Sequence, residues 1–381
     1  MTWGFFKARE VAYPRLDPLF RIVRNPTHSD TFFSMKTSFG WLFTILLLPM
    51  AIAVIISSSA RSADPSSQSL NLGAAEPADP NLVVGNEACV KCHAAEIQVR
   101  KKTPHATKVD QLHRRPEAKA IASKLGLTSI KNSGRCVACH YTQQQTPETA
   151  LHVISGVSCE SCHGPGKNWL AVHHDFGGEG LTSLNESPEH RAKRIADSVK
   201  AGMRNPKNVY AVAQSCLRCH TTADEELVNL GGHSAGSLEF EFVSWSQGLI
   251  RHNFLGSDGK ANRVNSPERL RLMFVAGLIA ELEASLRATA LATEKATYGV
   301  TSAQRAARAG ARLKSLNAKI DSPQVRQIVD IFGSIKLQLN NESQLTAAAN
   351  QIAVLGLEFA ESNQADLSTL DRFIPGPDRY K

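Results

Sequence analysis

The chain has few long apolar runs. Among its 381 residues only one uncharged stretch, 39–56, approaches the length needed to cross a bilayer. A polytopic membrane protein is therefore excluded. The sequence also lacks a glycine-rich phosphate loop and a Ser/His/Asp set that spacing would reveal, so neither a nucleotide-binding site nor a serine nucleophile is indicated. Apolar residues at 42% and charged residues at 20% exclude wholesale disorder and a collagen-like fibre.

The single apolar stretch, 39–56, has the layout of an export signal. Lys36 precedes it, and small residues at 57–60 offer a cleavage site near 60–63. A retained membrane anchor is the alternative, because eighteen apolar residues reach the lower limit for spanning a bilayer. Met35 directly before Lys36 is a second candidate start. Both interpretations predict an exported, periplasmic protein, either soluble or tethered through 39–56, with 1–63 as leader and 64–80 as a flexible linker.

Cysteine is absent outside residues 89–219, where all eight cysteines form four motifs of one kind, C-x-x-C-H. The motifs, numbered here from first to fourth, are Cys89-Val-Lys-Cys92-His93, Cys136-Val-Ala-Cys139-His140, Cys159-Glu-Ser-Cys162-His163 and Cys216-Leu-Arg-Cys219-His220. C-x-x-C-H is the attachment signature of c-type haem. Two thiols three residues apart match the two porphyrin vinyl groups, and the following imidazole binds the iron. Disulfides and zinc sites are the alternatives, but neither requires histidine at the fifth position every time. The motifs predict four covalently bound haem c groups.

Histidines outside the motifs supply candidates for the distal iron ligands. Eight lie beyond the leader: His105, His113, His152, His173, His174, His190, His233 and His252. Only Met203 and Met273 compete with them, so bis-His ligation and low potentials are favoured, since Met/His ligation raises the potential. The predicted distal ligands are His105, one of the neighbours His173 and His174, and His233 and His252. His152 remains open, whereas His113 and His190 lie beside arginines and indicate a solvated face.

Two further sequence features accompany the four C-x-x-C-H motifs. A histidine follows the first motif by twelve residues, and residues 156–166 read Gly-Val-Ser-Cys-Glu-Ser-Cys-His-Gly-Pro-Gly around the third motif. With four C-x-x-C-H motifs, roughly residues 85–255 resemble the tetrahaem cytochromes c of the cytochrome c-554 and c-552 type. That family carries electrons from hydroxylamine oxidoreductase in ammonia oxidisers, and relatives occur in many other bacteria.

The resemblance implies a ligand set with one exception to bis-His ligation. In the family three haems have two histidine ligands and one haem is five-coordinate. Carried over, His105 becomes the distal ligand of a later haem, and His173 or His174 becomes that of the first. The second haem, held by Cys136, Cys139 and His140, becomes the candidate open site. This sequence departs from the family by its long leader and by a C-terminal extension of over a hundred residues.

The predicted fold is mainly α. Residues 81–262 form a tetrahaem cytochrome c domain of short helices and loops around stacked haems, in which 238–245 alternates apolar and polar residues like a strand. Residues 263–381 lack cysteine and histidine and form a haem-free antiparallel helical bundle. Its helices are expected to start after Ser266, near 301–302, after Ser322 and near Ser343, where capping residues or Ser-Pro pairs precede apolar stripes.

The formal charge of +8 does not indicate nucleic-acid binding. Residues 1–63 carry seven basic and three acidic residues, so half of the excess lies in the leader. Each haem adds two propionates, which gives about −1 for a ferric and −2 for a ferrous group. Four haems bring the remaining +4 to about zero when oxidised. Many lysines and arginines are therefore better interpreted as partners of propionates.

Two functions are consistent with these features. The first is a periplasmic electron carrier that exchanges electrons with redox partner proteins, such as a donor enzyme, an acceptor cytochrome or a membrane quinone complex. The alternative is a haem enzyme that reduces or oxidises a small nitrogen species (nitrite, hydroxylamine or nitric oxide) at one five-coordinate haem. A structural role within a membrane-bound complex is a third, if 39–56 stays as an anchor. Electron carriage is favoured because four haems lie on about 180 residues.

Haem-free protein is predicted to be largely unfolded between residues 81 and 262. About 45 residues per haem cannot bury a substantial side-chain core, so haem attachment and folding are coupled. Hydrogen exchange on protein made without haem attachment measures this directly, and rapid exchange throughout 81–262 is expected. A cooperative melt of that region without haem would contradict the prediction.

Overall fold

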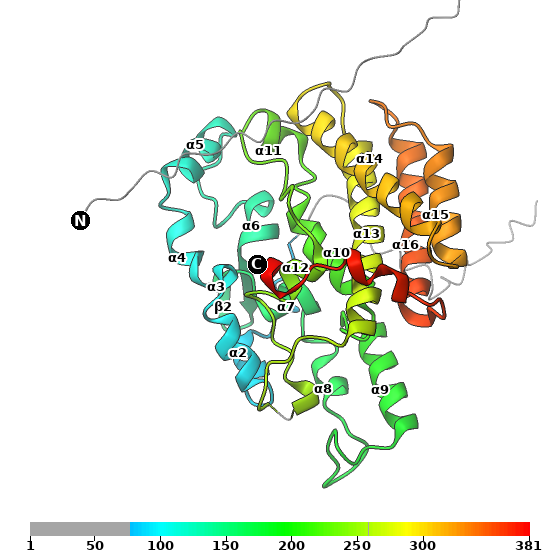
Figure 1. The fold of residues 1–381 in the computed structure, drawn as a ribbon. Coiled ribbons are helices and arrows are strands. Elements are labelled where there is room, and N and C mark those ends of the chain that lie inside the picture. Colours follow the sequence, from blue (N-terminus) through cyan, green and yellow to red (C-terminus); the bar gives the residue numbers. More distant parts are fainter. Residues whose placement is uncertain (1–76, 258) are drawn as a thin grey trace, which may run out of the picture. The chain divides into compact units, whose positions relative to one another are not determined.

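The structure, a computed structural model, describes residues 77–257 and 259–381. Helices dominate these residues, which confirms the mainly α fold (Figure 1). The leader and its apolar stretch 39–56 lie outside them, as does all but the end of the linker. Within the described ranges no helix is both long and apolar enough to cross a bilayer.

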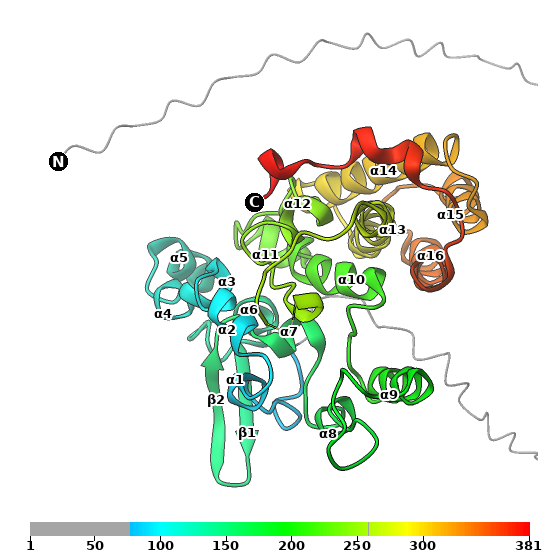
Figure 2. The ribbon, with the colours of Figure 1, turned by 60° about the horizontal axis from the view of Figure 1, so that its bottom comes forward.

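The motif-bearing part of the chain consists of short helices and one hairpin. Its helices are α1 (Asn86–Val90), α2 (Ala94–Arg100), α3 (Pro104–Thr107), α4 (Val109–Leu112), α5 (Pro116–Lys124), α6 (Gly134–His140), α7 (Cys159–His163), α8 (Leu170–His173), α9 (Pro188–Lys200), α10 (Val209–His220), α11 (Glu225–Asn229) and α12 (Phe242–Ser246), followed by the 3₁₀ turn η2 (Leu255–Ser257). Strands β1 (Thr142–Thr146) and β2 (Thr149–Ser155) pair antiparallel between the second and third motifs (Figure 2).

Four longer helices, here called the C-terminal helices, follow. They are α13 (Pro267–Ala290), α14 (Thr297–Asn317), α15 (Pro323–Ser334) and α16 (Glu342–Ser362), and the 3₁₀ turns η3 (Ser368–Phe373) and η4 (Pro377–Arg379) come after them. Two predicted starts are confirmed: the hydroxyls of Ser266 and Ser322 accept the amide hydrogens of Arg269 and Val325. The start of α16 is one residue from the expected position. The predicted start of α14, near 301–302, is wrong by four residues. The helix begins at Thr297 without a capping side chain that the sequence could reveal.

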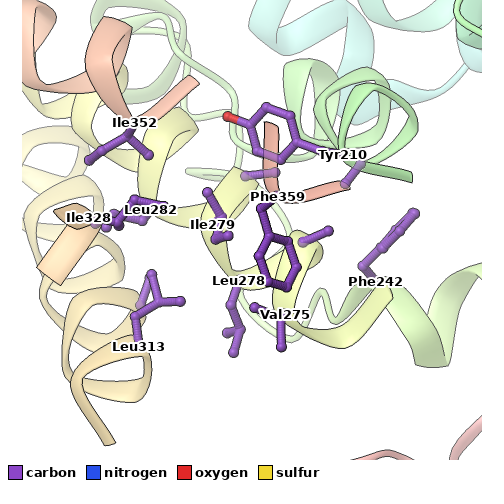
Figure 3. Packing of buried hydrophobic residues seen from close by; sticks show 14 of the residues in the cluster. Tyr210, Phe242, Val275, Leu278, Ile279, Leu282, Leu313, Ile328, Ile352 and Phe359 are labelled. Carbon is purple, nitrogen blue, oxygen red and sulfur yellow. The ribbon is translucent and has the colours of Figure 1, made fainter. Parts of the chain in front are cut away.

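The helix α13 lies at the centre of the main hydrophobic core. It packs against α14 and α16 within the C-terminal helices, and against α10 and α12 of the motif-bearing part (Figures 1 and 2). Residues on every side of α13 are therefore buried, rather than the single apolar stripe that its leucine spacing predicts. Figure 3 shows Tyr210 and Phe242 in one cluster with Val275, Leu278 and Ile279. One core thus crosses the predicted boundary at residue 262, and the division into two domains stays a prediction.

Two glycines set how closely these helices approach. A Cβ atom at Gly277 of α13 would lie 2.6 Å from the Cβ of Phe242 on α12. A Cβ atom at Gly356 of α16 would lie 2.4 Å from the ring of Tyr210 on α10. Both distances are shorter than side chains allow, so any larger residue would push α10 or α12 away from the C-terminal helices.

A buried polar network adds to the contact between α10 and α13. The carboxylate of Glu283 accepts hydrogen bonds from the Tyr210 hydroxyl, from Gln214 Nε2 at 2.8 Å and from Arg287 Nε at 3.0 Å. Burial raises the pKa of Glu283, and Arg287 opposes that rise. Because a buried carboxylate needs several partners, this network fixes α10 in one position along α13.

The strand predicted for 238–245 was wrong. This segment turns into α12, where the carboxylate of Glu241 accepts the amide hydrogens of Val243 at 3.1 Å and Ser244 at 2.6 Å. The neighbours Phe242 and Val243 are both buried, which the alternation of a half-exposed strand does not allow. Capping and packing against α13 therefore override the alternating pattern.

The substitution Ile279→Ala is expected to destabilise the holoprotein by about 2–5 kcal/mol, because it opens a cavity where α13 is packed on all sides. Ile279 is 0% exposed. Urea unfolding followed by helical circular dichroism measures the change. Val354→Ala on α16 is the control, since Val354 is 55% exposed and a change below about 0.5 kcal/mol is expected. Equal effects of the two substitutions would contradict the central place of α13.

Candidate functional site

Each motif lies on a short helical turn. The helices α6, α7 and α10 end at the motif histidines His140, His163 and His220, and in the first motif the amide of His93 donates to Cys89 O at 3.0 Å. One helical turn places residues three apart on the same face. The two thiols of each motif therefore share a side, and the histidine follows directly.

Local capping explains why these turns form. The Ser158 hydroxyl accepts Ser161 N at 3.3 Å and the Ser161 hydroxyl accepts Ser158 N at 2.9 Å, a reciprocal capping box at the start of α7. At the start of α10 the side chain of Asn208 accepts the amide hydrogens of Tyr210 and Ala211. Both helices thus begin at fixed residues, and the motifs that they carry are fixed with them.

Every motif histidine faces a second histidine from a distant part of the chain. The ring centroids are 6.3 Å apart for His93 and His173, 6.2 Å for His220 and His105, 6.1 Å for His140 and His233, and 6.2 Å for His163 and His252. The angles between the ring planes are 23°, 54°, 56° and 88° in the same order. All four separations therefore agree to within 0.2 Å although the ring orientations differ widely.

These separations fit two ligands on one metal. No hydrogen bond joins the two rings of any of these pairs, and centroids about 6 Å apart lie in the upper half of the range for ring contacts, about 4.5–7 Å. Two metal–imidazole bonds of about 2.0–2.1 Å, each continued to the centre of its ring, separate the centroids by about 6 Å. Since a pair of thiols accompanies each motif histidine, the residues fit four haem c groups with two histidine ligands each.

The distal partners include three of the predicted residues without ambiguity, His105, His233 and His252. The choice between the neighbours at 173 and 174 is also clear. His173 faces His93, whereas His174 is exposed and its Nδ1 lies 2.6 Å from Leu170 O. His174 is therefore not brought to a motif histidine. The roles of all these histidines as iron ligands stay predictions.

The open position that the resemblance implied for the second haem does not match the geometry. After α11 the chain turns through Gly232, whose φ of +81° lies in the left-handed region that favours glycine. The amide of His233 then donates to Leu227 O at 3.1 Å. This turn places the His233 ring opposite His140, at the same separation as in the other three pairs.

The remaining histidines and methionines have other contacts. His190 pairs with Glu186 at 2.8 Å, and His152 Nδ1 lies 2.8 Å from Ala150 O. His113 has a buried Nδ1 without a partner among the described residues. The methionine sulfurs accept from neighbouring asparagines, Met203 from Asn205 and Met273 from Asn265. These contacts account for His152, His190 and the two methionines without an iron, whereas no such contact in the described part of the chain accounts for His113.

Burial keeps several of the paired imidazoles neutral, and hydrogen bonds at Nδ1 orient two of them. Burial lowers the pKa of His163, His173 and His220 to about 4, so near neutral pH they carry a free nitrogen lone pair. Nδ1 of His163 lies 3.1 Å from Arg204 O, and Nδ1 of His220 lies 2.8 Å from Ser237 Oγ. An acceptor at Nδ1 fixes the tautomer that leaves Nε2 free for a metal.

The motifs lie next to one another in a definite order. The amide of Cys159 in the third motif donates to Asn86 Oδ1, three residues before the first motif, at 3.4 Å, and Cys219 Sγ of the fourth motif donates to Ala138 O within the second at 3.8 Å. The third and fourth motifs are joined by the Ser215 hydroxyl, which donates to Cys162 O at 2.9 Å. Adjacent sites therefore follow the order first, third, fourth, second.

Sequence reasoning missed the role of Glu160, which lies inside the third motif. Its carboxylate is 2% exposed and accepts three amide hydrogens, from Val84 at 2.9 Å, Gly85 at 2.9 Å and Gly166 at 2.7 Å. It thereby fixes the segment before the first motif against the turn after the third. The charged residue within an otherwise small-residue stretch was the available signal, but two of its three partners lie 75 and 76 residues away.

A close backbone contact explains why the residue at position 156, just before the third motif, is a glycine. A Cβ atom at this position would lie 2.4 Å from His105 O, and the next residue, Val157, donates its amide hydrogen to that same oxygen at 3.1 Å. The absence of a side chain thus allows α3 to approach the third motif. His105 is held in place by this contact while its ring faces the fourth motif.

Neither a disulfide nor a zinc site, the two alternatives for the cysteines, is present among residues 77–257 and 259–381. All eight cysteines, which fall within these ranges, are free thiols. In the same ranges no three His, Cys, Asp or Glu side chains are grouped as a mononuclear metal site would require.

Comparison with known proteins points in the same direction. Residues 88–164 match the family described as cytochrome c554 and c-prime. A relative, cytochrome c-554 of Nitrosomonas europaea, is 35% identical over 143 residues, which make up 36% of this chain and 56% of the relative. The chain thus spans about half the length of the relative that it matches. No solved structure gives a significant match. The resemblance to c-554-type cytochromes c is confirmed.

The substitution Glu160→Gln is expected to destabilise the holoprotein by about 3 kcal/mol, because it leaves at least one buried amide hydrogen without an acceptor and removes a charge-assisted contact. The urea midpoint measures this. Glu148→Gln in the exposed hairpin turn is the matched control and should leave the midpoint unchanged. An unchanged midpoint for both variants would contradict the anchoring role of Glu160.

Proposed function

We propose that this chain, which carries a region of the cytochrome c-554 type, is a tetrahaem electron carrier of the periplasm. Each C-x-x-C-H motif attaches one haem c. The first to fourth motif histidines are the proximal ligands, and His173, His233, His252 and His105 are the respective distal ligands. When bound, haem c supplies an iron that exchanges one electron between its ferric and ferrous states, and two histidine ligands keep its potential low.

One observation carries this proposal: all four histidine pairs have the separation that two ligands on one iron require. An iron with six ligands exchanges electrons without binding substrate. The alternative function, turnover of a small nitrogen species, needs an open iron position, and the second haem was the candidate for it. The placement of His233 opposite His140 favours electron carriage over that alternative.

The neighbouring motifs supply a route for electrons within the chain. Contacts of the third motif with the segment of the first, and of the fourth motif with the third and the second, would bring successive haems together in that order. The first and second motifs are the two ends of this order, and the third and fourth lie between them. We infer that electrons enter and leave at the first and second motifs.

The low potential expected for haems with two histidine ligands also indicates which redox partner proteins the chain has. A carrier with low-potential haems exchanges electrons with a donor enzyme and with an acceptor cytochrome or a membrane quinone complex. The export signal at 39–56 supports a periplasmic place, and retention of that segment would tether the protein to the membrane.

The electron paramagnetic resonance spectrum of the oxidised protein tests the proposal. Four low-spin ferric signals and no high-spin signal are expected, and the reduced protein should not bind carbon monoxide. The low-spin signals should differ among themselves, because their anisotropy depends on the angle between the ligand planes, which is 23° for His93 and His173 but 88° for His163 and His252. A high-spin haem that binds carbon monoxide in the native protein would favour the enzyme alternative.

Variants of two histidines provide the control. His233→Ala should convert one haem to high spin and create one carbon monoxide site, because it removes the ligand opposite His140. His174→Ala should leave the spectrum unchanged, because this ring is exposed and faces no motif histidine. The opposite result for either variant would contradict the proposed ligand set.

A further inference from the structure

The C-terminal helices place a buried arginine against the fourth motif. Arg305 on α14 is 1% exposed, and its Nη1 donates to the backbone oxygen of His220 at 3.0 Å. The amide of Ser237 donates to the same oxygen at 2.8 Å, and the Ser237 hydroxyl lies 2.8 Å from His220 Nδ1. Arg305 and Ser237 therefore hold the backbone and the ring of the fourth proximal histidine together.

The chain makes room for this contact at Gly236. A Cβ atom there would lie 2.5 Å from Arg305 Nη1 and 2.5 Å from His220 O. The φ of Gly236 is +85°, a conformation that other residues rarely adopt. A glycine next to Ser237 thus allows the guanidinium to reach the histidine carbonyl.

The guanidinium of Arg305 has no carboxylate in direct contact among residues 77–257 and 259–381. Nε and Nη2 are buried and have no hydrogen-bond partner within the described part of the chain. Glu281 on α13 attracts the guanidinium, whereas Arg308, one turn along α14, repels it. Arginine does not lose its proton in proteins, so a buried cation remains beside the fourth proximal ligand.

A cation at this place would act on the redox equilibrium of an iron bound by His220. Reduction adds one negative charge to the haem, and a buried positive charge stabilises the reduced form more than a solvated charge would. At the first site Nδ1 of His93 lies 3.5 Å from the carboxylate of Glu96. The buried Arg194, which donates to the backbone oxygen of His173, is paired with the carboxylate of Glu186. The arginine at the first site is thus neutralised by a carboxylate in contact with it, whereas Arg305 has no such ion pair within the described part of the chain.

We propose that Arg305 is a positioning residue of the fourth haem site, through which the C-terminal helices raise the reduction potential of that haem above the potential of the first. This proposal rests on the proposed function, since it requires haem at both motifs. It gives residues 263–381, which lie outside the match to the cytochrome c-554 family, a direct part in the redox chemistry.

A redox titration of the full holoprotein, with the haems distinguished by their paramagnetically shifted nuclear magnetic resonance signals, tests it. In the unsubstituted protein the fourth haem should be reduced before the first. Arg305→Gln retains a side-chain donor for His220 O but removes the charge. It should lower the reduction equilibrium constant of the fourth haem about tenfold, a change of 59 mV for one electron.

Two matched variants distinguish an electrostatic role of Arg305 from a purely structural one. Arg305→Lys retains the charge and should keep the potential of the fourth haem near its original value. Arg308→Gln removes the same charge from an exposed position on the same helix and should leave all four potentials unchanged. A purely structural role of Arg305 would make the Gln and Lys variants alike.

Several outcomes would overturn the proposal. They are a first haem that is reduced before the fourth in the unsubstituted protein, an Arg305→Gln variant with unchanged potentials, or equal shifts from Arg305→Gln and Arg308→Gln. The first measurement needs no variant, so it decides the question even if Arg305→Gln fails to assemble. Failure of the proposed function would instead be visible as high-spin haem in the unsubstituted protein.

Discussion

Four pairs of imidazoles from distant parts of the chain share one separation of about 6 Å, and no hydrogen bond joins the two rings of any pair. Contacts between rings tolerate centroid separations of about 4.5–7 Å, so the agreement of all four pairs to within 0.2 Å fits one partner shared by both members of each pair. The partners of a pair come from segments such as α3 and α10, or α8 and the first motif, which have few other reasons to meet. Short helices, turns and the β1–β2 hairpin are arranged so that these rings face each other. Local devices such as Gly156 and Glu160 then hold the segments where the pairs require them.

The rest of the molecule follows a different principle. In the C-terminal helices ordinary apolar burial provides the stability, and α13 is surrounded by α10, α12, α14 and α16. The helix α10 belongs to both parts, because its first turns lie in this core and its last turn carries the fourth motif. The fourth site is therefore the one that the packed core supports directly, through Tyr210, Glu283 and Arg305. The other three motifs lie on one- or two-turn helices that depend more on their ligands.

Local features were predictable from the sequence, and long-range ones were not. Each C-x-x-C-H motif lies within one helical turn, and the caps Ser266 and Ser322 act within three residues, so spacing alone identified them. The pairing of His163 with His252, or of His140 with His233, depends on how the chain turns at residues such as Gly232, which no periodicity encodes. The segment 238–245 was misassigned because α13 buries Phe242 and Val243 together. Glu160 and Arg305 escaped notice because their partners lie about 75 and 85 residues away in the chain.

The positions of the paired histidines along the chain set the point in synthesis at which both members of each pair are present. A chain made from its N-terminus exposes the first three motifs before the histidines that face them, since His173, His233 and His252 all come later. Only the fourth motif meets a partner, His105, that has already emerged. Counted along the chain, the pair of the first motif is complete when His173 emerges, and the pair of the fourth motif is complete when His220 emerges. The pairs of the second and third motifs are complete only with His233 and His252, which follow the last motif. These two pairs therefore depend on segments that are made after all the cysteines.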